Sequence, residues 1–204
     1  MTMLKINLKT TRLAYFLTLI HIVTRGMLYS VPLLNINLNG HLQYLLLFLA
    51  EFSYLGVLVY LILVLRHFGY KWLPLPLILL LITEMVSFAT ATFFRPDNKD
   101  TAVLYSGTLA GLSVFFLAAE VWLSIATYHV RNNHVLRSFR LFAFTLLSAH
   151  IAKTLLTVYF AFLLVTKDQD YLNYVNLLYL VPPLTVFFII QRVSIALGES
   201  KVSG

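Results

Sequence analysis

Six long apolar stretches recur from one end of this 204-residue sequence to the other, and they limit the possible fold more than any other feature. A helix that crosses a bilayer needs roughly 20 predominantly apolar residues. The stretches lie at about 13–34, 42–65, 74–94, 103–129, 141–166 and 173–195, with end errors of a few residues. We therefore predict an all-α polytopic membrane protein, a bundle of six transmembrane helices that forms a single domain over residues 1–204.

The amino-acid composition is typical of an integral membrane protein. Hydrophobic residues make up 60% of the sequence and charged residues 11%, with a mean hydropathy of +0.84. Soluble domains are about half apolar and about a quarter charged. Cysteine is absent, which excludes disulfides, thiolate metal sites and cysteine nucleophiles.

The basic residues in the connectors and near the ends of the spans are distributed very unevenly between the two sides of the predicted bundle. Short connectors make consecutive helices antiparallel, so the connectors alternate in side. Ten basic residues fall on one side: Lys5, Lys9, Arg12, Arg66, Lys71, Arg131, Arg137, Arg140, Arg192 and Lys201. Only Arg95, Lys99 and Lys167 fall on the other. The positive-inside rule then predicts that both termini are cytoplasmic, in a bacterial inner membrane or its organelle equivalent. This bias also explains the net charge of +7 without a nucleic-acid partner.

Five charged residues lie inside predicted spans, each in a different one: Arg25, Glu51, Glu84, Glu120 and Lys153. At a rise of ~1.5 Å per residue they sit roughly 16 to 22 Å from the cytoplasmic edge of a core about 30 Å thick. Each costs about 2.5–3.5 kcal/mol if it faces lipid. We therefore expect them to turn inward and meet at a shared polar site.

Two histidines, His21 and His150, belong to the same predicted site. His21 lies four residues before Arg25, and His150 three before Lys153, so each pair shares one helical face. Thr83, Ser87 and Thr90 beside Glu84, and Ser124 one turn after Glu120, extend the predicted lining. Two bases and three acids leave one carboxylate over, and that group or a histidine can carry a proton. The alternative is that the charges only fix helix register through buried pairs.

Two further motifs concern the helices themselves. Pro182 and Pro183 stand in the sixth span, where prolines kink or break a helix. Such breaks expose backbone to midplane sites in transporters, but in many other membrane proteins they only shape the helix. Gly107 and Gly111 form a Gly-x-x-x-Gly step, which predicts close helix packing within the bundle or between subunits.

The functional prediction is binding and translocation of a small polar or ionic solute. Proton coupling would pass through Glu51, Glu84 or Glu120, with Arg25 and Lys153 as counter-ions or anion ligands. We expect no cofactor or metal and favour a non-enzymatic role, because no catalytic motif is present. Two alternatives stay open: an accessory or assembly subunit of a larger membrane complex, and a membrane enzyme or haem protein that uses His21 and His150 as ligands. A chain of this size is expected to act as a homo-oligomer or with a partner membrane subunit.

Overall fold

The protein consists of long helices joined by short connections. The computed structural model describes residues 6–34, 36–94, 98–128, 134–163 and 174–202. The helices are α1 (Leu8–Leu33), α2 (Gly40–His67), α3 (Pro74–Phe93), α4 (Lys99–Tyr128), α5 (His134–Leu163) and α7 (Val181–Val202), the last preceded by the 3₁₀ turn η1 (Leu177–Leu180). In this part of the chain, six helical segments are long and apolar enough to cross a membrane. The predicted all-α class and the multi-pass membrane architecture are confirmed at that level.

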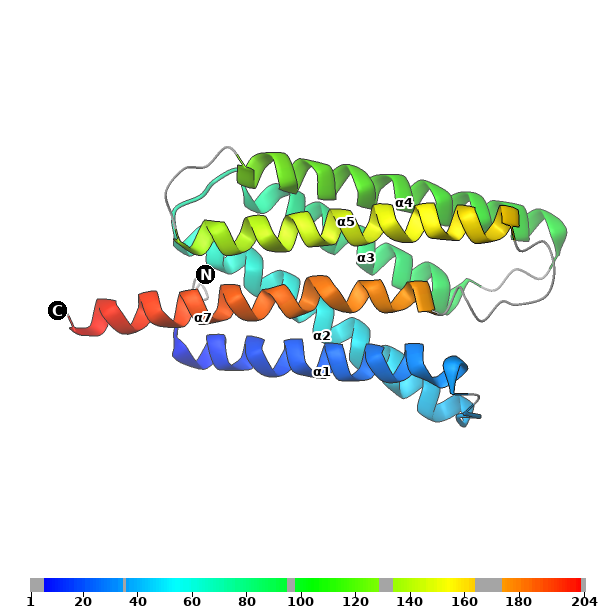
Figure 1. The fold of residues 1–204 in the computed structure, drawn as a ribbon, viewed down its shortest axis with the longest axis horizontal. Helices are drawn as coiled ribbons and strands as arrows, with labels where there is room; N and C mark the ends of the chain where they lie inside the picture. Colours follow the sequence, from blue (N-terminus) through cyan, green and yellow to red (C-terminus); the bar gives the residue numbers. More distant parts are fainter. Residues whose placement is uncertain (1–5, 35, 95–97, 129–133, 164–173, 203–204) are drawn as a thin grey trace.

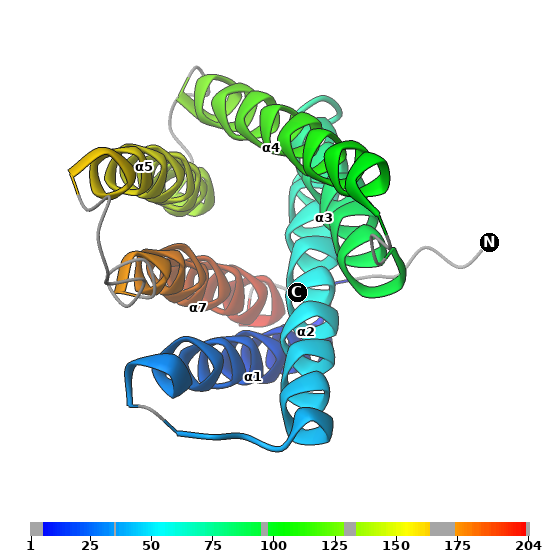
Figure 2. The ribbon, with the colours of Figure 1, turned by 90° about the vertical axis from the view of Figure 1, so that its right-hand side faces the viewer.

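The six helices form a closed ring in chain order. Each helix packs against the next one along the chain, and α1 packs against α7. Figure 2 shows this ring from one end. The start of α1 and the end of α7 lie at the same end of the bundle, which we call the termini end; the opposite end is the far end (Figure 1). Which end faces the cytoplasm stays a prediction. Four of the basic residues on which that prediction rests lie outside the described residues: Lys5, Arg95, Arg131 and Lys167.

Local sequence signals set several helix boundaries. Asn7 caps α1 in a reciprocal pair with Thr10, with both hydrogen bonds 2.9 Å long. The Asn39 side chain caps α2 by accepting from a backbone N–H two residues later at 3.1 Å. Between α2 and α3 the chain turns at Gly69, whose φ of 82° favours glycine. Pro74 then begins α3, where no backbone donor is needed.

Some helices are longer than the predicted spans at the termini end. The first begins at Leu8 rather than near residue 13, the fifth at His134 rather than near 141, and the last continues to Val202 rather than ending near 195. Hydropathy marks where a helix leaves hydrocarbon, whereas capping and backbone hydrogen bonding mark where it ends. The helical turns beyond the spans are therefore polar and basic.

The two halves of the ring are packed differently. Its largest fully buried side chains lie between the middle and the termini end: Leu58, Leu61, Val64, Leu65, Leu77, Leu80, Leu123, Leu136, Phe139, Phe142, Val186 and Ile189. In the far half, α4 is mostly exposed from Ala102 to Ala118. Apolar side chains thus fill the interior of the ring toward the termini end. The far half contains none of these large, fully buried side chains.

The space around three glycines shows where neighbouring helices pack closely and where they do not. A Cβ atom at Gly56 would lie 2.7 Å from Cδ1 of Leu17, so this glycine allows α1 and α2 to approach closely. At Gly107 and Gly111, no described atom lies within 4 Å of such a Cβ position. The predicted close packing at these two glycines is therefore not made within the described chain, and packing between subunits stays a prediction.

Candidate functional site

A cavity of about 700 Å³ lies inside the ring, in its middle and far half. All six helices contribute to its lining. Leu80 and Leu146 belong to the apolar part of this lining, next to the packed half of the bundle, whereas Ala110, Ser113 and Thr154 are exposed lining residues farther toward the far end. The lining is therefore more exposed toward the far half, and packed apolar side chains bound the cavity toward the termini end.

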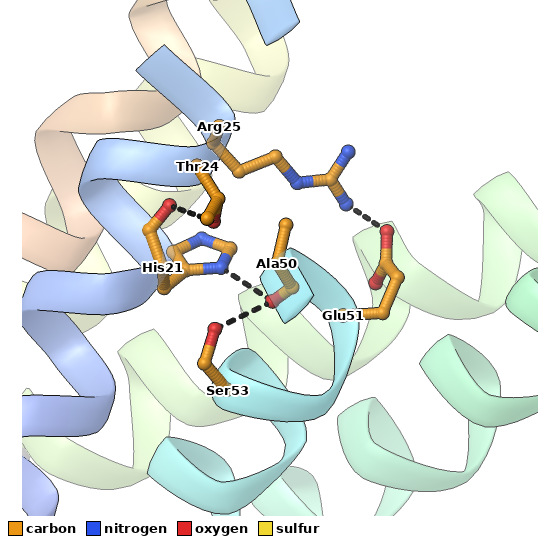
Figure 3. Close-up of polar contacts among 6 residues, drawn as sticks. All are labelled: His21, Thr24, Arg25, Ala50, Glu51 and Ser53. Carbon is orange, nitrogen blue, oxygen red and sulfur yellow. Dashed lines mark hydrogen bonds and ion pairs between the residues drawn. The ribbon is translucent and has the colours of Figure 1, made fainter. Parts of the chain in front are cut away.

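The first charged cluster joins α1, α2 and α3. The guanidinium of Arg25 forms an ion pair with the carboxylate of Glu51 (Figure 3). Glu51 is only 5% exposed, and its Oε2 has no hydrogen-bond partner among the described residues. Glu84 lies within electrostatic range of both side chains. Two carboxylates thus share one guanidinium, which leaves one negative charge in excess when both are ionised.

His21 is held in a fixed orientation beside this cluster. Its Nδ1 lies 2.8 Å from the carbonyl oxygen of Ala50, which also accepts a hydrogen bond from the Ser53 hydroxyl at 2.9 Å (Figure 3). A carbonyl oxygen only accepts, so Nδ1 must carry the proton, and Nε2 of the neutral ring is an acceptor. The ring also stacks on Tyr54 with a centroid distance of 4.8 Å. The packing therefore determines both the orientation of His21 and its tautomer.

The second charged cluster joins α4 and α5. Nδ1 of His150 lies 3.1 Å from Oε2 and 3.3 Å from Oε1 of Glu120, which is 3% exposed. A carboxylate in this position fixes the orientation of the histidine ring through Nδ1. Because Nδ1 faces the carboxylate, Nε2 is the nitrogen of His150 left for other partners.

Lys153 is placed differently from the other charged residues. Its Nζ lies 4.5 Å from the ring centroid of Tyr179 in η1, a cation–π contact. Among the described residues, no carboxylate oxygen lies within 4 Å of this ammonium. Arg25 is near enough to act on Lys153 electrostatically and repels it. Lys153 is thus a cavity cation whose charge no described carboxylate neutralises by direct contact.

The structure brings the predicted site residues together. His21, Arg25, Glu84, Glu120, His150 and Lys153 all line the cavity. Glu51 is not part of the lining, but it forms an ion pair with Arg25, which is. Pro182 and Pro183 also line the cavity, and they stand at the start of α7, where the 3₁₀ turn η1 passes into α-helix.

The sequence did not predict three of the lining residues, and four polar residues expected in the lining lie elsewhere. Tyr29, Tyr54 and Tyr179 face the cavity. The signal was their helical spacing, because Tyr29 follows Arg25 by four residues and Tyr54 follows Glu51 by three. The expected polar lining was wrong at Thr83, Ser87, Thr90 and Ser124, none of which lines the cavity. The Thr83 hydroxyl donates to the carbonyl of Leu79 at 2.8 Å, and the Ser124 hydroxyl donates to the carbonyl of Ala143 at 3.2 Å.

His21 and His150 are the residues of this cavity best suited to bind a haem or metal, since each keeps Nε2 available. Within the described ranges, no three histidine, aspartate or glutamate side chains are grouped closely enough to hold a metal ion.

Fold and cavity define a class: a multi-pass helical membrane protein in which a six-helix ring surrounds a charged pocket. No protein-family model, curated protein or solved structure matches this chain. The function is therefore argued from the cavity.

Proposed function

We propose that this protein binds a small polar or ionic solute in the cavity and carries it across the membrane. The observation behind the proposal is the charge pairing. Arg25 pairs with Glu51, and Glu120 with His150, but neither Lys153 nor Glu84 has an oppositely charged group within 4 Å among the described residues. A charge held at membrane depth without a partner is costly. A bound solute with an anionic group would neutralise Lys153, and a proton would neutralise Glu84.

The uneven packing of the ring supports transport rather than binding alone. Transporters bind solutes near the bilayer midplane and expose the site to one side at a time. Here the exposed lining residues Ser113 and Thr154 lie in the far half, while side chains such as Phe139 and Phe142 fill the termini half. This is the arrangement expected for one of the two states of such a cycle. The change from η1 to α7 beside the cavity offers a place where the last helix can bend.

Proton coupling is the finer part of the proposal, and it is assigned to Glu84. Glu84 and Glu51 lie close to one guanidinium, and Glu51 already forms the ion pair. A proton on Glu84 removes the excess negative charge of the cluster. Release of that proton would leave a charge that a solute or a rearranged Arg25 must balance, which links proton movement to solute movement.

The proposed orientation places the termini end in the cytoplasm, with the cavity open to the opposite side. The basic residues at the termini end support this, because cytoplasmic connections are enriched in Lys and Arg. We propose a bacterial-type inner membrane, and an assembly with further copies or a partner subunit.

Binding is tested by thermal unfolding of the purified protein in detergent at constant ionic strength. The probes are lactate, glutamate, glycine betaine, ethanolamine and glucose, which cover the anionic, zwitterionic, cationic and neutral classes. We expect at least one anion-bearing probe to raise the unfolding temperature of the wild type and not of Lys153→Met. Lys99→Met is the matched control, because Lys99 is exposed at the start of α4 and outside the cavity. No shift with any probe, or the same shift in Lys153→Met, contradicts the binding site.

Transport is tested in proteoliposomes that enclose a pH-sensitive dye, with the probe that shifted the unfolding temperature added outside. We expect solute entry with proton movement in the wild type and in Asp100→Asn, a control at an exposed carboxylate. Glu84→Gln should keep the fold and lose the proton signal. Solute entry without protons in the wild type contradicts coupling. Correctly folded Glu84→Gln and Glu120→Gln variants that fail only to join a larger complex would favour the accessory role.

The haem alternative is tested separately by the optical spectrum of the purified protein. A Soret band that disappears in His21→Phe and His150→Phe would support haem and contradict the solute site.

A further inference from the structure

A second cavity, of about 1030 Å³, lies on the outside of the bundle near the termini end. It is lined by the last turns of α4, the first turns of α5 and the middle of α7. None of its lining residues belongs to the central cavity. It is therefore a separate site, and an argument about it does not depend on the proposed transport function.

Three arginines converge on this outer cavity: Arg137 and Arg140 from α5 and Arg192 from α7. Nε of Arg140 donates to the backbone carbonyl of Thr127 at 2.7 Å, which fixes this guanidinium against α4. Arg137 and Arg192 are exposed. Among the described residues of the lining there is no aspartate or glutamate. The described part of the site thus carries three positively charged side chains and no negatively charged one.

Apolar side chains form the part of the lining that lies toward the membrane interior, whereas Ser124, Thr127, Ser138 and Gln191 add polar groups. Leu141 and Phe144 follow Arg137 on α5, and Phe188 precedes Arg192 on α7 by one turn. With ~1.5 Å per residue, Phe144 lies roughly 10 Å deeper than Arg137, and Phe188 roughly 6 Å deeper than Arg192. Phe144 is 67% exposed and Phe188 52%. Basic groups at the end of the bundle therefore continue into an exposed aromatic strip that runs along the helices.

We propose that this outer cavity binds an anionic phospholipid, with its phosphate group among Arg137, Arg140 and Arg192 and its acyl chains along Leu141, Phe144 and Phe188. Guanidinium groups bind phosphate oxygens in pairs of parallel hydrogen bonds. Basic pockets between transmembrane helices are known sites for anionic headgroups. A soluble phosphate compound would use the arginines but not the apolar strip, and that strip is what selects a lipid.

The test is native mass spectrometry of the purified protein with equal amounts of phosphatidylglycerol and phosphatidylcholine. We expect wild-type protein to bind phosphatidylglycerol preferentially. Each basic residue near an anionic lipid contributes about 1 kcal/mol, or roughly five-fold in binding constant. The double variant Arg137→Gln/Arg192→Gln should therefore bind phosphatidylglycerol roughly 25-fold more weakly and lose the preference. Arg140 is left intact because it also holds α4. The control is Arg66→Gln/Lys71→Gln, two exposed basic residues at the same end but outside the cavity.

Two further measurements separate the possible outcomes. Glycerophosphoglycerol, which has the same headgroup and no acyl chains, should fail to displace the lipid at equal concentration. Displacement at equal concentration would mean an anion site without lipid specificity and would overturn the proposal. Equal binding of the two lipids by the wild type overturns it as well, whatever the stability of the variants. The proposal is also overturned if Arg137→Gln/Arg192→Gln binds phosphatidylglycerol as strongly as the control Arg66→Gln/Lys71→Gln does.

Discussion

The ion pair between Arg25 and Glu51 can be tested by removing one charge. Glu51 is 5% exposed and the Arg25 side chain 20%, so the pair is largely shielded from water. Removing one partner of a buried pair typically costs about 3–5 kcal/mol, because the other charge is left uncompensated. Glu84 lies near Arg25 and can partly replace the lost carboxylate. We therefore expect Glu51→Gln to lower the free energy of unfolding by about 3 kcal/mol, at the lower end of this range.

Arg25→Met should destabilise the protein by at least as much, because it leaves two neighbouring carboxylates without their guanidinium. The double variant Arg25→Met/Glu51→Gln combines the two single changes and removes both charges. Neither partner of the pair is then left as an uncompensated charge. We expect the double variant to be more stable than either single variant. This non-additivity is the signature of a direct pair rather than two independent effects.

The assay is reversible unfolding in mixed detergent micelles, followed by helical circular dichroism. For a chain of this size, 3 kcal/mol corresponds to a fall of roughly 6–12 °C in unfolding temperature. Asp100→Asn, at an exposed position on α4, should leave the unfolding temperature unchanged within error. If Glu51→Gln unfolds at the wild-type temperature, or if the two single effects simply add in the double variant, the reasoning about a buried pair is wrong.

Three other substitutions test the buried core, the exposed glycine surface of α4 and the contact between Lys153 and Tyr179. Phe139→Ala, in the packed half, should cost about 3–5 kcal/mol in the same unfolding assay, because Phe139 is fully buried and leaves a cavity; a loss below about 1 kcal/mol would contradict dense packing there. Gly107→Ala should stabilise the protein by about 0.5–1 kcal/mol, since alanine suits a helix better and nothing described lies within 4 Å. A smaller oligomer for Gly107→Ala in size-exclusion chromatography would instead show a contact between subunits. Tyr179→Leu should weaken binding of the probe that stabilises the wild type several-fold, because it removes the ring that positions Lys153; unchanged affinity in the binding titration would show that this ring has no such role.

Much of the site was predictable because hydrocarbon penalises isolated charges. Arg25, Glu84, Glu120 and Lys153 come from four different helices, yet they had to turn inward, since facing lipid is costly for each. The pairing was not predictable. Charge counting allowed Lys153 to pair with any of the three glutamates, whereas Glu120 lies against His150 and Lys153 lies over Tyr179. Those choices depend on how each helix is rotated, which side-chain packing around the whole ring decides.

The sequence alone determined that this chain is helical and has six segments able to cross a membrane. Both are local properties, because lipid demands about 20 apolar residues per span and leaves each span to satisfy its own backbone hydrogen bonds. The sequence did not predict that α1 packs against α7 to close the ring. Nor did it predict that one half of the ring is filled by groups such as Phe139 while the other half holds the cavity. These features arise from volumes and shapes of side chains distant in sequence, which hydropathy does not encode.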